Sequence, residues 1–160
     1  MQIGGSGNGH VRCLERLDGK PVSGRLIYRR SERSLDVEPR PEGGITSLLI
    51  NDVQIEIDEN GCLMYVWGLC PHDSWITTTF DPPEAELGRL RYATGSLVPG
   101  VSKRLNAVKR WPVGYDTSSQ WLCIGDASVR GETIAFAPDS IAALTAGDLV
   151  ALWLRPEARV

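Results

Sequence analysis

The sequence predicts an all-β or β-dominated α+β fold: a single-domain antiparallel sandwich or partly open barrel with one short helix near 139–146. Three observations predict this fold class. Short apolar runs, about nine or ten of them, are separated by turn residues along the chain. Several runs alternate apolar and polar residues with the period of two that a half-buried strand requires. Only one stretch has helical spacing.

Residues 1–10 are predicted to form a flexible N-terminal segment, and residues 11–160 a single β-rich domain. The run GGSGNG at 4–9 has the composition of a flexible linker. A phosphate-binding loop would follow a strand and end in Lys-Ser or Lys-Thr, and this run does neither. A chain of 160 residues buries roughly two thirds of its unfolded surface, so it needs no disulfide or metal to fold.

The first predicted strands lie at 24–30 and 34–39. In 24–30, Leu26 and Tyr28 fall on one side of an alternating pattern. The prolines and paired glycines of 39–44 then predict a loop.

A β-hairpin is the strongest local prediction. Valine and isoleucine alternate with polar residues in 53–57, and the sequence DENG at 58–61 favours a turn. We therefore predict that 53–57 pairs with 62–67. Both faces of 62–67 are apolar, so this strand is expected to be central, with Tyr65 and Trp67 buried.

The second half of the chain predicts shorter strands. Consecutive prolines predict a loop at 81–88, and alternation predicts a half-exposed strand at 89–94. Pro112 restricts 107–116 to an edge strand or a bulged strand. Three further apolar strands are predicted at 120–125, 132–137 and 149–154, the last of them covered on both sides.

One short helix is predicted at 139–146. Asp139 or Ser140 can cap its first turn. Ile141 and Leu144 lie three residues apart, as on one helix face, and the glycine that follows the stretch can end it.

Charge and composition bear on the class of partner. The net charge of −3 argues against broad nucleic-acid binding, which usually needs a strongly basic face, and leaves a local basic patch open. No apolar run reaches the ~18 residues of a membrane span. The first residues show no basic segment followed by an apolar one, so a cytoplasmic location is expected. The four cysteines are then expected to be reduced.

The run YVWGLCPHDSW at 65–75 concentrates reactive residue types. Cys70, His72 and Asp73 fall on a turn beyond the central strand, where binding sites are common. A nucleophilic Cys70 would need a base, and His72 is only two residues away, whereas nucleophile and base normally come from separate parts of a fold. No cysteine-protease signature is present, so the turn is expected to be structural or binding rather than catalytic.

A zinc site is the other possibility at this turn. Cys62, Cys70, His72 and Cys123 could supply four ligands only if their strands converge. Structural zinc sites use closely spaced ligand pairs, and these residues do not form one. We therefore expect no metal and no cofactor.

Two tryptophans and two arginines are the remaining candidate binding residues. Trp75 follows the turn and Trp111 adjoins a proline, so both are expected to be partly exposed. Tryptophan and arginine dominate the energetics of protein interfaces. Arg89 and Arg91 lie in a locally basic third of the chain that could attract an anionic ligand or an acidic partner, although scattered surface charge has the same pattern.

Two functions remain open from these observations. The first is a non-enzymatic binding protein that recognises another protein, of the inhibitor or toxin-neutralising type; small size and the absence of a catalytic motif favour it. The alternative is a small-ligand-binding β-domain or small enzyme with a pocket near the 68–75 loop. A deep apolar pocket with converging polar groups would favour the alternative, and an exposed patch the first.

Overall fold

The computed structural model describes residues 14–93, 97–105 and 109–160. The expected flexible segment 1–10 lies outside these residues. Within them, strands account for nearly all the regular structure, and the one helical segment is the 3₁₀ turn η2 (His72–Ser74). This confirms the all-β prediction. No helix in the described ranges is long and apolar enough to cross a membrane.

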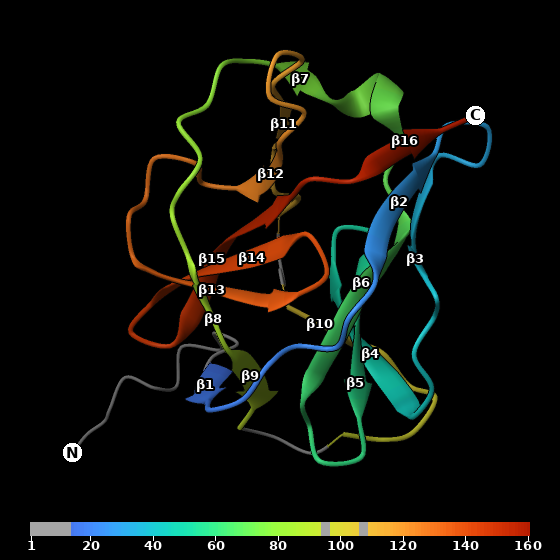
Figure 1. Ribbon diagram of the computed structural model, residues 1–160, viewed down its shortest axis with the longest axis vertical. Coiled ribbons are helices and arrows are strands. Elements are labelled where there is room, and N and C mark those ends of the chain that lie inside the picture. The colour runs from blue at the N-terminus through green and yellow to red at the C-terminus, as the bar shows by residue number, and fades with distance from the viewer. Residues whose placement is uncertain (1–13, 94–96, 106–108) are drawn as a thin grey trace.

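The strands form two seven-stranded sheets and one two-stranded ribbon (Figure 1). The first sheet runs in the spatial order β10 (Lys103–Arg104), β4 (Gly44–Ile50), β5 (Val53–Asp58), β6 (Leu63–Leu69), β3 (Ser34–Glu38), β2 (Arg25–Arg29) and β16 (Glu157–Arg159). The second runs β7 (Ile76–Thr77), β11 (Val113–Tyr115), β12 (Leu122–Gly125), β15 (Asp148–Leu154), β14 (Ser140–Thr145), β13 (Glu132–Ala137) and β8 (Glu86–Leu87). The ribbon pairs β1 (Leu14–Leu17) with β9 (Arg89–Tyr92).

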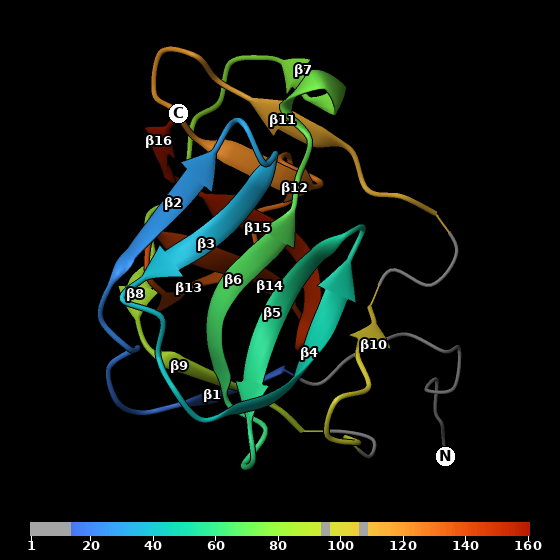
Figure 2. The same ribbon diagram turned by 90° about the vertical axis from the view of Figure 1, so that its right-hand side faces the viewer.

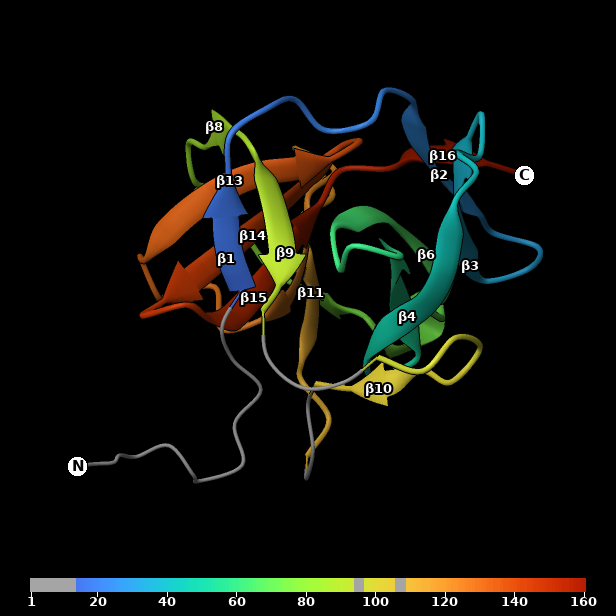
Figure 3. The ribbon, with the colours of Figure 1, turned by 90° about the horizontal axis from the view of Figure 1, so that it is seen from below.

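The two large sheets pack on each other as an open sandwich. One apolar cluster joins side chains of the first sheet, such as Leu26 and Ile55, to side chains of the second, such as Leu122 and Leu152. Figure 2 shows the first sheet in front of the second. β9 contacts both β6 and β13, so the β1–β9 ribbon lies at one end of the sandwich (Figure 3).

The predicted hairpin is confirmed. β5 and β6 are antiparallel, with Glu56 opposite Tyr65, and Gly61 adopts the positive φ of 82° that the turn requires. β6 lies between β5 and β3, as its two apolar faces predicted, and Tyr65 is buried. Trp67 is only half-buried, because its indole N–H donates to the carboxylate of Glu56 at a wet face of the sheet.

The predicted helix at 139–146 is wrong. Residues 140–145 form β14, which pairs with β13 on one side and β15 on the other. Asp139 does not cap a helix; it occupies the tight turn before β14 with a φ of 52°, and its carboxylate accepts the backbone N–H of Leu26. The spacing of Ile141 and Leu144 resembled a helix face because β14 is apolar on both faces, as a central strand is.

The outer face of the second sheet has its own small core. Cys123, Ala143 and Trp153 are buried there. They are covered by residues 78–85, here called the strap, which link β7 to β8 along that face (Figure 1). Phe80 of the strap meets the Trp153 ring edge-on, with 5.0 Å between ring centroids. β15 is therefore covered on both faces, as its sequence predicted.

Candidate functional site

The 70–75 turn is fixed by backbone hydrogen bonds. The N–H of Cys70 donates to the carbonyl of Arg33 at 2.8 Å, which ties the end of β6 to the β2–β3 turn. The Ser74 N–H and hydroxyl both donate to the carbonyl of Pro71, and the Trp75 N–H donates to the carbonyl of His72. The turn after β6 is thus a closed 3₁₀ turn.

Tyr28 connects the two reactive residues of this turn. Its hydroxyl lies 2.8 Å from the carbonyl oxygen of Cys70 and 3.1 Å from Nδ1 of His72. A carbonyl can only accept, so the single phenol proton goes to Cys70, and His72 must donate from a protonated Nδ1. Burial raises the pKa of Tyr28 to about 12, so the phenol keeps its proton. His72 is therefore held by a phenol from β2.

Cys70 has the properties of a core thiol. Its side chain is 3% exposed, and burial raises its pKa to about 11. At neutral pH such a thiol is protonated, and the protonated form is a poor nucleophile. Among the described residues, no group of three or more His, Cys, Asp or Glu side chains is placed to hold a metal ion.

Trp75 fills the space beside this turn. Its ring lies between Tyr28, at 4.9 Å, and Tyr115 of β11, at 5.0 Å between centroids. The cavity left among these three rings has a volume of only about 50 Å³. Small-molecule sites usually offer about 300–1,000 Å³, so this cavity beside the 68–75 loop is too small for a drug-sized ligand.

The structure does not bring all the predicted site residues together. Cys70, His72 and Trp75 share the turn, and Asp73 is paired with Arg33 at its exposed edge, 3.3 Å away. Arg89 and Arg91 lie on β9, at the opposite end of the molecule from η2 (Figure 1). There Arg91 pairs with Glu15 of β1 at 2.9 Å. Trp111 lies in a third region, apart from both the turn and β9.

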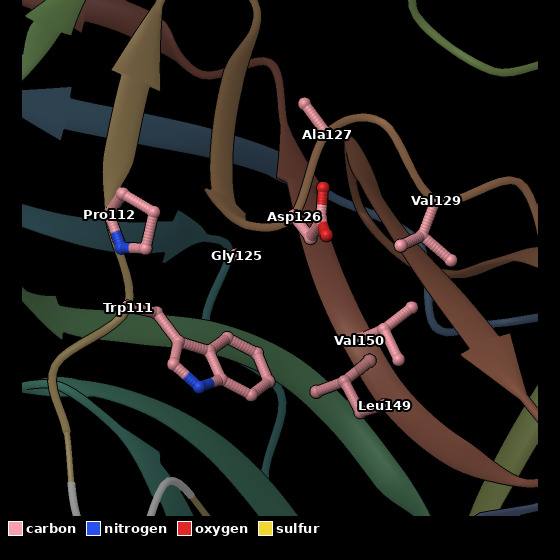
Figure 4. A pocket seen from close by; sticks show the side chains of 8 residues that line it. All are labelled: Trp111, Pro112, Gly125, Asp126, Ala127, Val129, Leu149 and Val150. Carbon is pink, nitrogen blue, oxygen red and sulfur yellow. The ribbon is translucent and has the colours of Figure 1, made fainter.

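Trp111 stands at the rim of an open cleft of about 480 Å³ between the β11–β12 and β15 strands. We call this the Trp111 cleft; it is lined by Trp111, Pro112, Gly125, Asp126, Ala127, Val129, Leu149 and Val150 (Figure 4). Seven of these eight residues carry no charge, and the eighth is an acid. The cleft is therefore an apolar hollow with one carboxylate.

Buried Asn51 positions the backbone of Trp111. Its Oδ1 accepts the Trp111 N–H at 2.9 Å, and its Nδ2 donates to the Trp111 carbonyl at 3.0 Å. The half-buried indole packs over Gly125, whose φ is +118°. A methyl group at Gly125 would lie 2.5 Å from the carbonyl oxygen of Val150 and 3.1 Å from Cε3 of Trp111. Glycine at 125 is required both for the backbone and for the seat of the indole.

Asp126 is the ionised group of the cleft. Its backbone N–H donates to the Val150 carbonyl, which fixes it against β15. Its Oδ1 accepts from the backbone N–H of Ser128 at 3.0 Å and from the Ser128 hydroxyl at 2.6 Å. These bonds favour the charged form and lower the pKa of Asp126 below its ordinary value. The cleft therefore carries a full negative charge at neutral pH.

Sequence reasoning selected Trp111 but not the other residues that line the cleft beside it. Asp126 directly follows the predicted strand 120–125, and a polar residue at a strand end is a signal that could have suggested it. Leu149 and Val150 gave no such signal, because apolar residues in a strand are ordinarily core.

Comparison with known proteins provides no relative from which a role could be transferred. No protein-family model matches this sequence, and no curated protein matches it. Function has to be inferred from the clefts and side chains themselves.

Proposed function

We propose that this protein is a non-enzymatic binding protein that recognises another protein, in the manner of an inhibitor or toxin-neutralising protein, and that the Trp111 cleft is its recognition site. The cleft is the observation that supports this most directly. It is open and apolar, and a half-buried tryptophan stands at its rim. Partly buried tryptophans at apolar hollows are typical centres of protein interfaces.

The polar groups of the cleft favour a protein over a small molecule. A small-molecule site orients its ligand with several placed polar groups. The lining of the Trp111 cleft has one charged side chain, Asp126. A partner protein is oriented by the rest of its interface and needs only one anchor here. The alternative of a ligand or substrate pocket near the 68–75 loop has little support, because Trp75 and its neighbours fill that space.

The setting of this proposed function is the cytoplasm. Cys62, Cys70 and Cys123 are free thiols, which fits a reducing compartment. The net charge of −3 favours a protein partner over nucleic acid.

Site-specific photocrosslinking tests the proposal. A photoreactive phenylalanine analogue replaces Val129 in the cleft or, as the control, exposed Glu42 in the β3–β4 loop. In cells of the source organism, we expect the Val129 position to form a discrete protein adduct that the Glu42 position does not form. The adduct should disappear when Trp111→Ala is added and persist with Trp121→Ala, which removes another half-buried tryptophan outside the cleft.

Two outcomes would contradict this function. One is the absence of any adduct at the Val129 position. The other is an adduct that survives Trp111→Ala while circular dichroism shows the variant to be folded. Either result would remove the cleft as a protein-recognition site.

A further inference from the structure

We propose that the Trp111 cleft binds a lysine or arginine side chain of its protein partner, with the aliphatic stem against Leu149 and Val150 and the cation between the Trp111 indole and the Asp126 carboxylate. This inference rests on the proposed function, because it names the group that the partner inserts. It is carried by the shape of the cleft, the aromatic rim and the position of the charge.

The apolar wall suits the stem of a long basic side chain. Leu149 and Val150 of β15 form one side of the hollow, and Val129 lies beside them (Figure 4). Lysine and arginine bury their methylene groups along such surfaces and keep the charged end near water. An open cleft of about 480 Å³ can hold the stem while its mouth stays hydrated.

The charged end of the partner side chain would meet two favourable groups. Tryptophan is the best aromatic partner of a cation, and Figure 4 shows the Trp111 indole on one side of the hollow and the Asp126 carboxylate on another. Within the described part of the chain, the hydrogen bonds to this carboxylate go to Oδ1, from Ser128. A carboxylate has acceptor capacity beyond two bonds, so Oδ2 can receive a further donor.

The arginines that adjoin the cleft in sequence direct their charge elsewhere. Arg110 pairs with Asp52 of the β4–β5 turn at 3.4 Å. Arg130 donates to the carbonyl of Asp81 in the strap at 3.2 Å. Among the residues that line the cleft, Asp126 is the charged one, and its carboxylate complements a cation and repels an acidic side chain.

Titration with model peptides tests the inference. Blocked Gly-X-Gly tripeptides with X as lysine, arginine, norleucine or glutamate are added to ¹⁵N-labelled protein, and the indole N–H signal of Trp111 is followed after assignment with Trp111→Phe. Lysine and arginine peptides should bind in the millimolar range, about tenfold tighter than norleucine, and glutamate should not bind. Asp126→Asn should weaken the lysine peptide about fivefold and leave norleucine unchanged. Asp18→Asn, at an exposed acid elsewhere, should change neither.

The results separate this inference from the proposed function. Equal binding of norleucine and lysine, or an Asp126→Asn variant with full lysine affinity, would overturn the cationic occupant. If the Trp111-dependent crosslink persisted in that case, protein recognition would stand with an apolar occupant. If the crosslink were absent, the recognition function itself would fail whatever the peptides did.

Discussion

At the scale of single residues, surroundings decide what Cys70 and Trp111 can do. Both residue types attract functional interpretation in a sequence. The thiol of Cys70 is buried in the apolar core, and this burial raises its pKa so that it keeps its proton. Asn51 holds the backbone of Trp111, and the indole stands half-buried at the rim of the cleft. The more reactive residue type thus has the structural role.

The raised pKa of Cys70 predicts a loss of stability in alkali. In the unfolded chain the thiol ionises near its ordinary pKa of 9, whereas in the folded chain it ionises near 11. Between these values the unfolded state binds fewer protons. The contribution of the Cys70 thiol to the free energy of unfolding is therefore complete below pH 9. It is lost as pH rises toward 11, by up to about 1.4 kcal/mol per pH unit.

Urea unfolding under reducing conditions at pH 7, 9 and 10.5 measures this loss. We expect the free energy of unfolding of Cys70→Ala to fall less steeply with pH than that of the wild type, so the difference between the two should become smaller. Val37→Ala removes buried methyl groups but no ionisable group, so its difference in free energy of unfolding from the wild type should not change with pH. Parallel pH dependences for wild type and Cys70→Ala would show that the thiol is not buried as described.

Candidate residues could be predicted when their sequence neighbours carried the signal, but not when distant strand pairing placed them. Trp111 could be selected because its own neighbours, a proline and two bases, indicated exposure. The sequence could not predict that Asp126 and Val150 share the cleft with Trp111, because the pairing of β12 with β15 joins distant parts of the chain. Arg89 and Arg91 were selected by local charge alone, and strand pairing places them beside β1.

At the scale of elements, period-two alternation located the hairpin, and short apolar runs located β12, β13 and β15 of the second sheet. Alternation did not reveal β4, because Thr46 and Ser47 are buried polar residues that interrupt the pattern. The Thr46 hydroxyl donates to the carbonyl of Val101, and the Ser47 hydroxyl donates to Gln54 at 2.6 Å. The sequence does not show these hydrogen-bond partners, so a buried, hydrogen-bonded hydroxyl residue looks like an exposed polar residue in the pattern.

A buried carboxylate between β11 and β12 is one of the groups that hold the strap. Oδ2 of buried Asp116 accepts the backbone N–H of Phe80 at 2.9 Å, and Oδ1 accepts the N–H and hydroxyl of Ser118. These bonds lower the pKa of Asp116. Because folding lowers the pKa of Asp116, its ionised carboxylate contributes to the stability of the fold at pH values above the unfolded pKa. This contribution to stability is lost as pH falls toward the folded pKa.

We expect Asp116→Ala to loosen the strap without unfolding the sandwich. Hydrogen exchange at the Phe80 amide should accelerate by about tenfold or more, whereas amides of β5 and β6 should keep their protection. The melting temperature should fall at pH 7, and the difference from wild type should shrink in strong acid. Asp81→Ala, at an exposed acid of the strap, should leave the Phe80 amide unchanged. Uniform acceleration across both sheets would contradict a local role.

At the scale of the whole molecule, the end of the described chain joins the two sheets. β15 belongs to the second sheet, and β16 follows it directly as the outermost strand of the first. Arg155, between them, donates its N–H to the carbonyl of Asp139, whose carboxylate accepts from Leu26 of β2. Asp139 thus bridges a turn of one sheet and a strand of the other.

Removal of residues 157–160 should destabilise the protein and expose β2. The lost ladder hydrogen bonds are worth about 0.5–1.5 kcal/mol each, and an open strand edge favours association. We expect a lower urea midpoint and a dimer fraction by light scattering that grows with concentration. Arg159→Ala keeps the strand and removes only exposed ion pairs, so its urea midpoint should stay close to that of the wild type and the protein should remain monodisperse. A truncated chain with wild-type stability would refute this role for β16.

The parallel pairing of β16 with β2 also orders events on the ribosome. β2 to β6 leave the exit tunnel early and can pair with one another as they appear, but the outer partner of β2 emerges only after every strand of the second sheet. The nascent chain therefore carries an unprotected strand edge until residues 157–159 have been synthesised. A polypeptide released before Glu157 would keep that edge, which marks it for chaperones and proteases that recognise incomplete products.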